Sequence, residues 1–180
     1  MSHVLTAIDK TLLNKVETLT GMTESEAEVA LNTISKFTMS GFIKIKKIER
    51  EGGSDRDVEV VNNFIKRMPH YRGMLYRGIP FCKLEKLQAF LKNLQENGGY
   101  AIDSMTSFTS DEFVAEDYAS SRHPVMMRIK NNRSGISIQE FSALYAESEI
   151  LVPKGTQYRV THISEVVEDG EILYIDMEEI

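Results

Sequence analysis

Two glutamates separated by one residue, Glu147 and Glu149, lie just before the short apolar run Ile150–Val152. The run predicts a buried strand, because it is short, wholly apolar and closed by a Pro-Lys-Gly turn. Side chains at positions i and i+2 of an extended chain point to the same face, so both carboxylates are expected to converge on one substrate. Such a pair suits cleavage of an N-glycosidic bond, where one carboxylate stabilises a cationic centre and the other manages the nucleophile. Taken alone, however, a Glu-x-Glu pair is more commonly a solvated strand edge.

Two upstream segments add further polar residues in contexts that suggest a site. Residues 75–79 form a short apolar strand that contains Arg77 followed by Gly78. Residues 105–119 begin with a Ser/Thr-rich strand end around Ser107 and continue into a helix. The planar fork of an arginine is suited to a phosphate, and a glycine allows close approach of the backbone to a ligand. Each residue also has a plain structural explanation, as a strand-end arginine, a turn glycine or a cap serine.

The ordered combination resembles the R-S-E class of mono-ADP-ribosyltransferases over roughly residues 73–177. The family arginine matches Arg77, and the serine motif, commonly S-T-S, aligns with residues 107–109. These read Ser-Phe-Thr and so depart from the motif at its second and third positions. Glu147 and Glu149 match the E-x-E of the arginine-directed branch.

The resemblance implies how NAD would be bound. Arg77 would bind a phosphate of NAD, and Gly78 would let the backbone approach the nicotinamide amide. Glu149 would hydrogen-bond the 2′-hydroxyl of the nicotinamide ribose and stabilise positive charge as nicotinamide departs. Ser107 would hold Glu149 and the nicotinamide end in position, and Thr109 stands where the family has its second serine.

The acceptor side of the site rests on Glu147. The resemblance implies that this carboxylate orients a target guanidinium and takes up its proton, since an arginine otherwise keeps that proton up to a pH of roughly 12. Tyr145, an aromatic residue in the preceding loop, is expected to contact the substrate. Phe108 and Tyr118 are expected to be core residues.

Length and composition fit a small soluble enzyme with an acidic charge balance. The chain has 180 residues, 42% of them hydrophobic, and a net charge of −6, which fits one domain with a sizeable core and disfavours direct nucleic-acid binding. The single cysteine, Cys82, is expected to be a packed thiol in a protein of the reducing cytoplasm. No secretion signal and no membrane-spanning apolar run is evident in the sequence.

Other types of site find no support in the sequence. The four histidines and the cysteine have no metal-ligand spacing, so no metal is expected. No Walker loop, dinucleotide G-x-G-x-x-G or Ser-His-Asp order is present. NAD is therefore expected to serve as a consumed co-substrate, not as a hydride carrier.

The expected fold class is α+β, because helical patterns dominate residues 1–70 and strand patterns dominate residues 71–180. Thr23 with Glu26 predicts a capping box, Asp55 predicts a helix start, and residues 42–48 are ambiguous. Later segments predict further elements: helices over 83–97 and 111–119, and strands over 74–77, 125–129, 149–152, 157–163 and 172–177. The resemblance adds two small, roughly perpendicular sheets around an NAD cleft, with the N-terminal helices alongside, as one domain over residues 1–180.

The functional hypothesis is transfer of ADP-ribose from NAD to an accessible arginine of a target protein. The chain resembles small phage-encoded transferases, which suggests host transcription or translation proteins as targets and the host cytoplasm as the location. Two alternatives remain open. Water would replace the acceptor in an NAD glycohydrolase, and a non-catalytic interaction domain would keep the fold alone.

Overall fold

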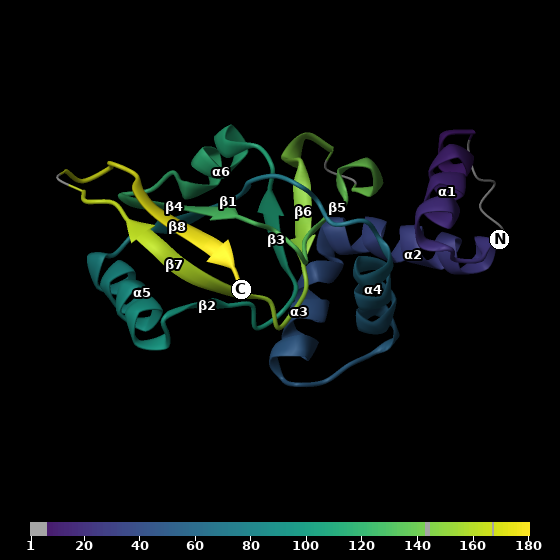
Figure 1. The fold of residues 1–180 in the computed structure, drawn as a ribbon, viewed down its shortest axis with the longest axis horizontal. Coiled ribbons are helices and arrows are strands. Elements are labelled where there is room, and N and C mark those ends of the chain that lie inside the picture. Colours follow the sequence, from purple (N-terminus) through teal and green to yellow (C-terminus); the bar gives the residue numbers. More distant parts are fainter. Residues whose placement is uncertain (1–6, 143–144, 167) are drawn as a thin grey trace.

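The computed structural model describes residues 7–142, 145–166 and 168–180. Helices come first and most strands follow, which confirms the expected mixed class (Figure 1). The helical elements are α1 (Ala7–Thr20), α2 (Glu24–Lys36), the π-helical η1 (Phe37–Gly41), α3 (Phe42–Arg50), α4 (Arg56–Arg67), α5 (Leu84–Asn97), α6 (Glu112–Ala119), and the 3-10 turns η2 (Gln139–Phe141) and η3 (Tyr145–Glu147). The strands are β1 (Leu75–Phe81), β2 (Gly99–Ala101), β3 (Thr106–Thr109), β4 (His123–Lys130), β5 (Ile136–Ser137), β6 (Glu149–Val152), β7 (Gln157–Ile163) and β8 (Leu173–Glu179).

Local signals set the starts of the early helices. Thr23 caps α2 through the predicted capping box, in which Glu26 donates its N–H to the Thr23 hydroxyl and accepts the Thr23 N–H on its carboxylate. Asp55 caps α4, also as predicted. The ambiguous residues 42–48 are helical, because Ile45 is buried in the helical core and the chain continues unbroken through η1 into α3.

The strands form one sheet in the order β2-β7-β8-β4-β1-β3-β6-β5. β1 pairs with β4 along its whole length, whereas β1 and β3 share only the pair Tyr76 and Thr109. At this junction the sheet divides into a larger half ending at β1 and a smaller half of β3, β6 and β5. The strands of the two halves run in different directions in Figure 1. The two expected small sheets are therefore present as halves of a continuous sheet.

Two apolar cores stabilise the fold, and β6 contributes to both. Leu151 packs in the core formed by helices α1 to α4, whereas Ile150 and Val152 pack in the core formed by α5 and the larger half of the sheet. Successive side chains of a strand point to opposite faces, so the two cores cover the two faces of β6. Glu149 shares the face of Leu151 and is therefore directed toward the N-terminal helices.

Helix α6 packs closely against β1 at Gly78. A Cβ atom at this position would lie 1.9 Å from the carbonyl oxygen of Ala115 and 2.6 Å from the amide nitrogen of Ala119. The glycine is needed because the helix backbone occupies that space. The structure thus gives a packing reason for the glycine, and the approach of its backbone to a nicotinamide amide stays a prediction.

Several local expectations were wrong. Cys82 is exposed, not packed. β1 extends to Phe81, and the short strands β2 and β5 were not predicted because two or three residues carry no readable periodicity.

Candidate active site

A pocket of about 430 Å³ opens where the sheet divides between β1 and β3. Its lining comes from η1, α3, β1, β3, α6 and the segment around the start of β6: Phe37, Thr38, Met39, Phe42, Lys46, Tyr76, Arg77, Gly78, Pro80, Ser107, Phe108, Thr109, Val114, Ala115, Tyr118, Glu147 and Glu149. The predicted Arg77, Gly78, Ser107, Thr109 and both glutamates therefore meet in one concave site. The size is that of a typical small-ligand pocket.

Glu149 lies at the inner wall of the pocket and is only 6% exposed. The sheet register places Ser107 opposite Leu151, two residues from Glu149 on the same face. This diagonal arrangement brings the two side chains within reach, and the Ser107 hydroxyl donates to Oε1 of Glu149 over 2.5 Å. Ser142 donates to the other carboxylate oxygen at 3.5 Å. Glu149 is thus a buried carboxylate in a fixed orientation.

Burial raises the pKa of Glu149 above its ordinary value, and the charge of Glu147 raises that pKa further. The hydrogen bonds from Ser107 and Ser142 and the charge of Lys46 act in the opposite direction. A carboxylate in this environment interacts strongly with a cationic centre, because little water screens it.

Glu147 reaches the same pocket by a different route from the one predicted. It belongs to the 3-10 turn η3, and Ser148, between the two glutamates, has a left-handed φ of 46°. The chain is therefore not extended at Glu147, and the i, i+2 argument for a shared face was wrong in its reason. A turn brings the second carboxylate to the pocket.

Thr109 and Tyr118 hold the position of Glu147. The Thr109 hydroxyl donates to the Glu147 carbonyl at 2.7 Å and accepts the Asp111 N–H at 3.0 Å. That hydroxyl therefore fixes the glutamate turn to the start of α6. The Tyr118 hydroxyl donates to Oε1 of Glu147 at 2.6 Å.

The prediction that Phe108 and Tyr118 are core residues holds for Phe108 and fails for Tyr118. Phe108 is buried, as expected, although it also borders the pocket. Tyr118 is 57% exposed at the pocket wall, so its assignment to the core was wrong. The amphipathic pattern of α6 is weak, since Phe113 is also exposed, and apolar character alone did not distinguish inward from outward positions. The backbone of Tyr145 belongs to η3, but its side chain lies outside the described residues.

Arg77 bridges the dividing strands beneath the pocket. It projects from β1, and its Nη1 donates to the backbone carbonyl of Ser107 on β3 at 2.6 Å. The guanidinium carbon also lies 5.8 Å from the centre of the Phe108 ring. Burial lowers the pKa of this guanidinium, and its Nε is buried without a hydrogen-bond partner among the described residues. Burying an N–H donor without a partner costs free energy, unless a ligand oxygen accepts its hydrogen bond.

The N-terminal helices supply a wall of the pocket that sequence reasoning missed. η1 contributes the side chains of Phe37 and Met39 to the lining, and α3 contributes Phe42 and Lys46. Burial lowers the pKa of Lys46, and the charges of Arg77 and Arg50 lower it further. Lys46 is part of the run Lys-Ile-Lys-Lys, in which sequence alone gives no reason to single out one lysine. A π-helical segment beside it is a feature often found at functional sites.

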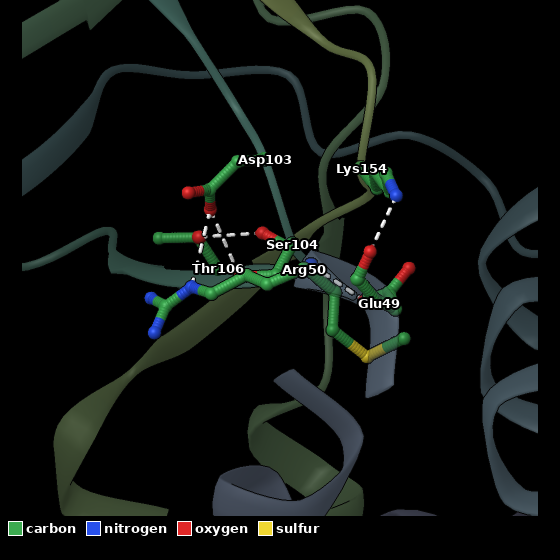
Figure 2. A network of polar contacts seen from close by, with 7 residues as sticks. Glu49, Arg50, Asp103, Ser104, Thr106 and Lys154 are labelled. Atoms are coloured by element: carbon green, nitrogen blue, oxygen red, sulfur yellow. Dashed lines mark hydrogen bonds and ion pairs between the residues drawn. The ribbon is translucent and has the colours of Figure 1, made fainter. Parts of the chain in front are cut away.

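A buried carboxylate of α3 fastens this wall to the segment that leads into β3 (Figure 2). Glu49 of α3 is 3% exposed, and its Oε1 accepts the backbone N–H of Met105 at 2.8 Å. The Lys154 amine donates to the Glu49 carbonyl at 2.5 Å, and Arg50 pairs with Asp103 at 3.5 Å. Met105 precedes β3, so the contact sets the distance between α3 and the Ser107 strand.

The sequence profile of the ADP-ribosyltransferase exoenzyme family matches residues 75–179, which is more than half of the chain. The chain therefore belongs to this family of ADP-ribosyltransferases, which use NAD as the substrate that donates ADP-ribose. A search of curated protein sequences gives no significant match.

Solved structures of this family share the fold. The Vis toxin of Vibrio splendidus is 20% identical, with a TM-score of 0.68 over 95% of this chain and 82% of that chain. HopU1 of Pseudomonas syringae is 16% identical, with a TM-score of 0.68 over 99% and 89% of the two chains. An exoenzyme of Clostridium limosum is 14% identical, with a TM-score of 0.66 over 97% and 95%. At these identities the likeness concerns the fold alone.

The pocket fits NAD by its own chemistry. Two cations, Arg77 with its orphaned donor and Lys46, suit a diphosphate, and the buried Glu149 suits a ribose that becomes cationic as its base leaves. Within the described ranges, His, Cys, Asp and Glu side chains form no group that could hold a metal ion. In the same part of the chain, none of the helices combines the length and apolarity needed to cross a membrane.

Proposed function

We propose that this protein is an R-S-E class transferase that moves ADP-ribose from NAD to arginine side chains of target proteins and releases nicotinamide. The observation that carries the proposal is the Ser107–Glu149 hydrogen bond in a pocket shared with Glu147 and Arg77. The hydrogen bond orients the buried carboxylate of Glu149. The pocket places a second carboxylate and a cation beside it, within reach of one substrate.

The roles divide between the two ends of the pocket. Arg77 and Lys46 bind the phosphates of NAD, because both are cationic and partly desolvated. Glu149 hydrogen-bonds the ribose and stabilises the positive charge that grows at its anomeric carbon as the bond to nicotinamide breaks. Ser107 keeps Glu149 aimed at that carbon, and the departing nicotinamide takes the electron pair of the broken bond.

Glu147 serves the acceptor. A guanidinium binds its carboxylate by charge-assisted hydrogen bonds, and one guanidinium nitrogen attacks the anomeric carbon. The new carbon–nitrogen bond forms as the nitrogen gives up one proton to Glu147. The Vis toxin has been solved in complex with agmatine, a guanidine compound, which supports guanidine as the acceptor chemistry.

A specific observation keeps NAD hydrolysis as the second candidate. Glu149 is buried and held by two hydroxyls, whereas Glu147 is only partly buried at the pocket mouth. Water can therefore reach the reacting carbon when no guanidine is present. A non-catalytic interaction domain is less well supported, since the chain keeps the arginine, the serine and both glutamates.

The proposed transfer to arginine implies that the partner is a protein with an accessible arginine. We propose a single domain over residues 1–180, because helices of the first part line the pocket of the second. By resemblance to phage-encoded transferases, we propose a host transcription or translation protein as the target and the host cytoplasm as the location.

The decisive experiment incubates the protein with NAD, with and without agmatine, and measures both nicotinamide and the agmatine adduct by mass spectrometry. Acceptor-dependent release with a guanidine adduct is the expected result. Release without any adduct indicates a glycohydrolase, and no release in either case indicates a binding domain. The same assay in a bacterial lysate, followed by peptide mapping, should place ADP-ribose on arginine. Adducts mainly on asparagine, cysteine or nucleic-acid bases would overturn the arginine assignment.

A further inference from the structure

The carboxylate of Glu147, the proposed acceptor-binding group, is held by an exposed side chain. Among the described residues, its hydrogen-bond partner is the hydroxyl of Tyr118, which donates to Oε1 at 2.6 Å. Tyr118 lies in the last turn of α6 and is 57% exposed. The support therefore comes from the pocket mouth, not from the protein interior.

The hydrogen bond leaves the two carboxylate oxygens in different states. Oε1 is occupied by the phenol, whereas Oε2 has no hydrogen-bond partner among the residues described. The hydrogen bond to Glu147 raises the pKa of Tyr118 to about 12, and burial and the charge of Glu147 act in the same direction, so the phenol stays protonated and remains the donor at neutral pH. Oε2 of Glu147 therefore remains available to a second donor.

The backbone of Glu147 is fixed independently of its carboxylate. Thr109 binds the Glu147 carbonyl, and the Ser148 carbonyl accepts the Ser110 N–H at 3.0 Å. These contacts hold the turn but leave the side-chain torsions free. The Tyr118 hydroxyl is thus the group that selects the direction of the carboxylate.

We propose that Tyr118 is a positioning residue for the acceptor step, holding Oε1 of Glu147 so that Oε2 receives the acceptor guanidinium. The proposal rests on the proposed arginine transfer and goes beyond it by assigning a residue that determines the balance between transfer and hydrolysis. The Tyr118 hydroxyl makes no hydrogen bond to Glu149 or Ser107, so removing that hydroxyl alone should leave nicotinamide release nearly unchanged.

The test is Tyr118→Phe, which keeps the ring and removes only the hydroxyl. Transfer to agmatine should fall roughly tenfold, the usual effect of one charge-assisted hydrogen bond, while nicotinamide release without acceptor stays within about twofold. NAD affinity by calorimetry should not change. The matched control is Tyr174→Phe, because the Tyr174 ring packs on Arg128, outside the pocket. It should leave both activities unchanged.

A double-mutant cycle separates positioning from general stability. In a Glu147→Gln background, Tyr118→Phe should cause no further loss of transfer, because the group that it orients has lost its function. Additive losses, or an equal fall in transfer and hydrolysis, would overturn the role of Tyr118. If the unsubstituted protein releases nicotinamide but forms no agmatine adduct, the proposed function itself fails.

Discussion

The two glutamates occupy contrasting surroundings within one pocket. Glu149 begins β6, is nearly buried and is held by the hydroxyls of Ser107 and Ser142. Glu147 lies in a turn at the mouth and is held by an exposed phenol. The difference teaches that, under the proposed function, one carboxylate serves a fixed electrostatic task and the other meets acceptors that arrive from solvent.

The largest expected effect is that of Glu149→Gln. The substitution keeps the shape but removes the charge opposite the developing cation, so transfer and hydrolysis should both fall by roughly 10²–10³-fold. Nicotinamide release under saturating NAD measures the loss. A residual rate within a few-fold of the unsubstituted protein would remove Glu149 from the catalytic centre.

The same variant should be more stable than the unsubstituted protein at neutral pH. Because the folded pKa of Glu149 is raised above 4.5, the folded state binds this proton more readily than the unfolded chain does. The stability due to this group is therefore complete below the unfolded pKa and is lost as pH rises through the folded pKa. Thermal unfolding of both proteins from pH 4 to 8 should show the advantage of the Gln variant growing with pH, and a constant difference would contradict the raised pKa.

The next largest effect is that of Glu147→Gln on transfer alone. Losing the base and the charge partner of the guanidinium should reduce the agmatine adduct by roughly 10²-fold, while hydrolysis stays within a few-fold. Measuring both products in one reaction gives the ratio directly. If the two rates fall together, the contrast between the glutamates is not functional.

A smaller effect is expected for Arg77→Lys. Lysine keeps the charge, but it lacks the planar fork that bonds the Ser107 carbonyl while offering further donors to a phosphate. The dissociation constant for NAD should rise roughly tenfold, since about one charge-assisted hydrogen bond is lost. Calorimetry checks this, with Arg128→Lys as the control outside the pocket. An unchanged affinity would leave Arg77 with a purely structural role.

The smallest and most specific effect concerns pH and Ser107→Ala. The Ser107 hydrogen bond lowers the pKa of Glu149 against the dominant effect of burial. Removing the hydroxyl should therefore move the acidic limb of the hydrolysis profile to higher pH, with a modest loss at the plateau. The rate from pH 4 to 8 gives this limb, and a shift to lower pH would contradict the assigned contact.

Much of this arrangement was predictable from local sequence. The capping box at Thr23, the Asp55 cap and the bounds of β6 and β7 follow from near neighbours in the chain. The order of the arginine, the serine and the two glutamates in the sequence also singled out side chains that the structure brings into one pocket. Local signals carry such features because hydrogen bonds between near neighbours, or the apolar pattern along one strand, favour them.

Tertiary structure alone decided how those residues meet. Glu147 enters the pocket through a left-handed turn at Ser148, although the sequence favoured an extended chain. Lys46 became part of the site because Glu49 fastens α3 to the strand that carries Ser107. Tyr118 is exposed and not part of the core, because α6 packs on Gly78 through its alanines. In each case the deciding contact joins segments far apart in the chain, and no local pattern encodes which of several similar side chains will face it.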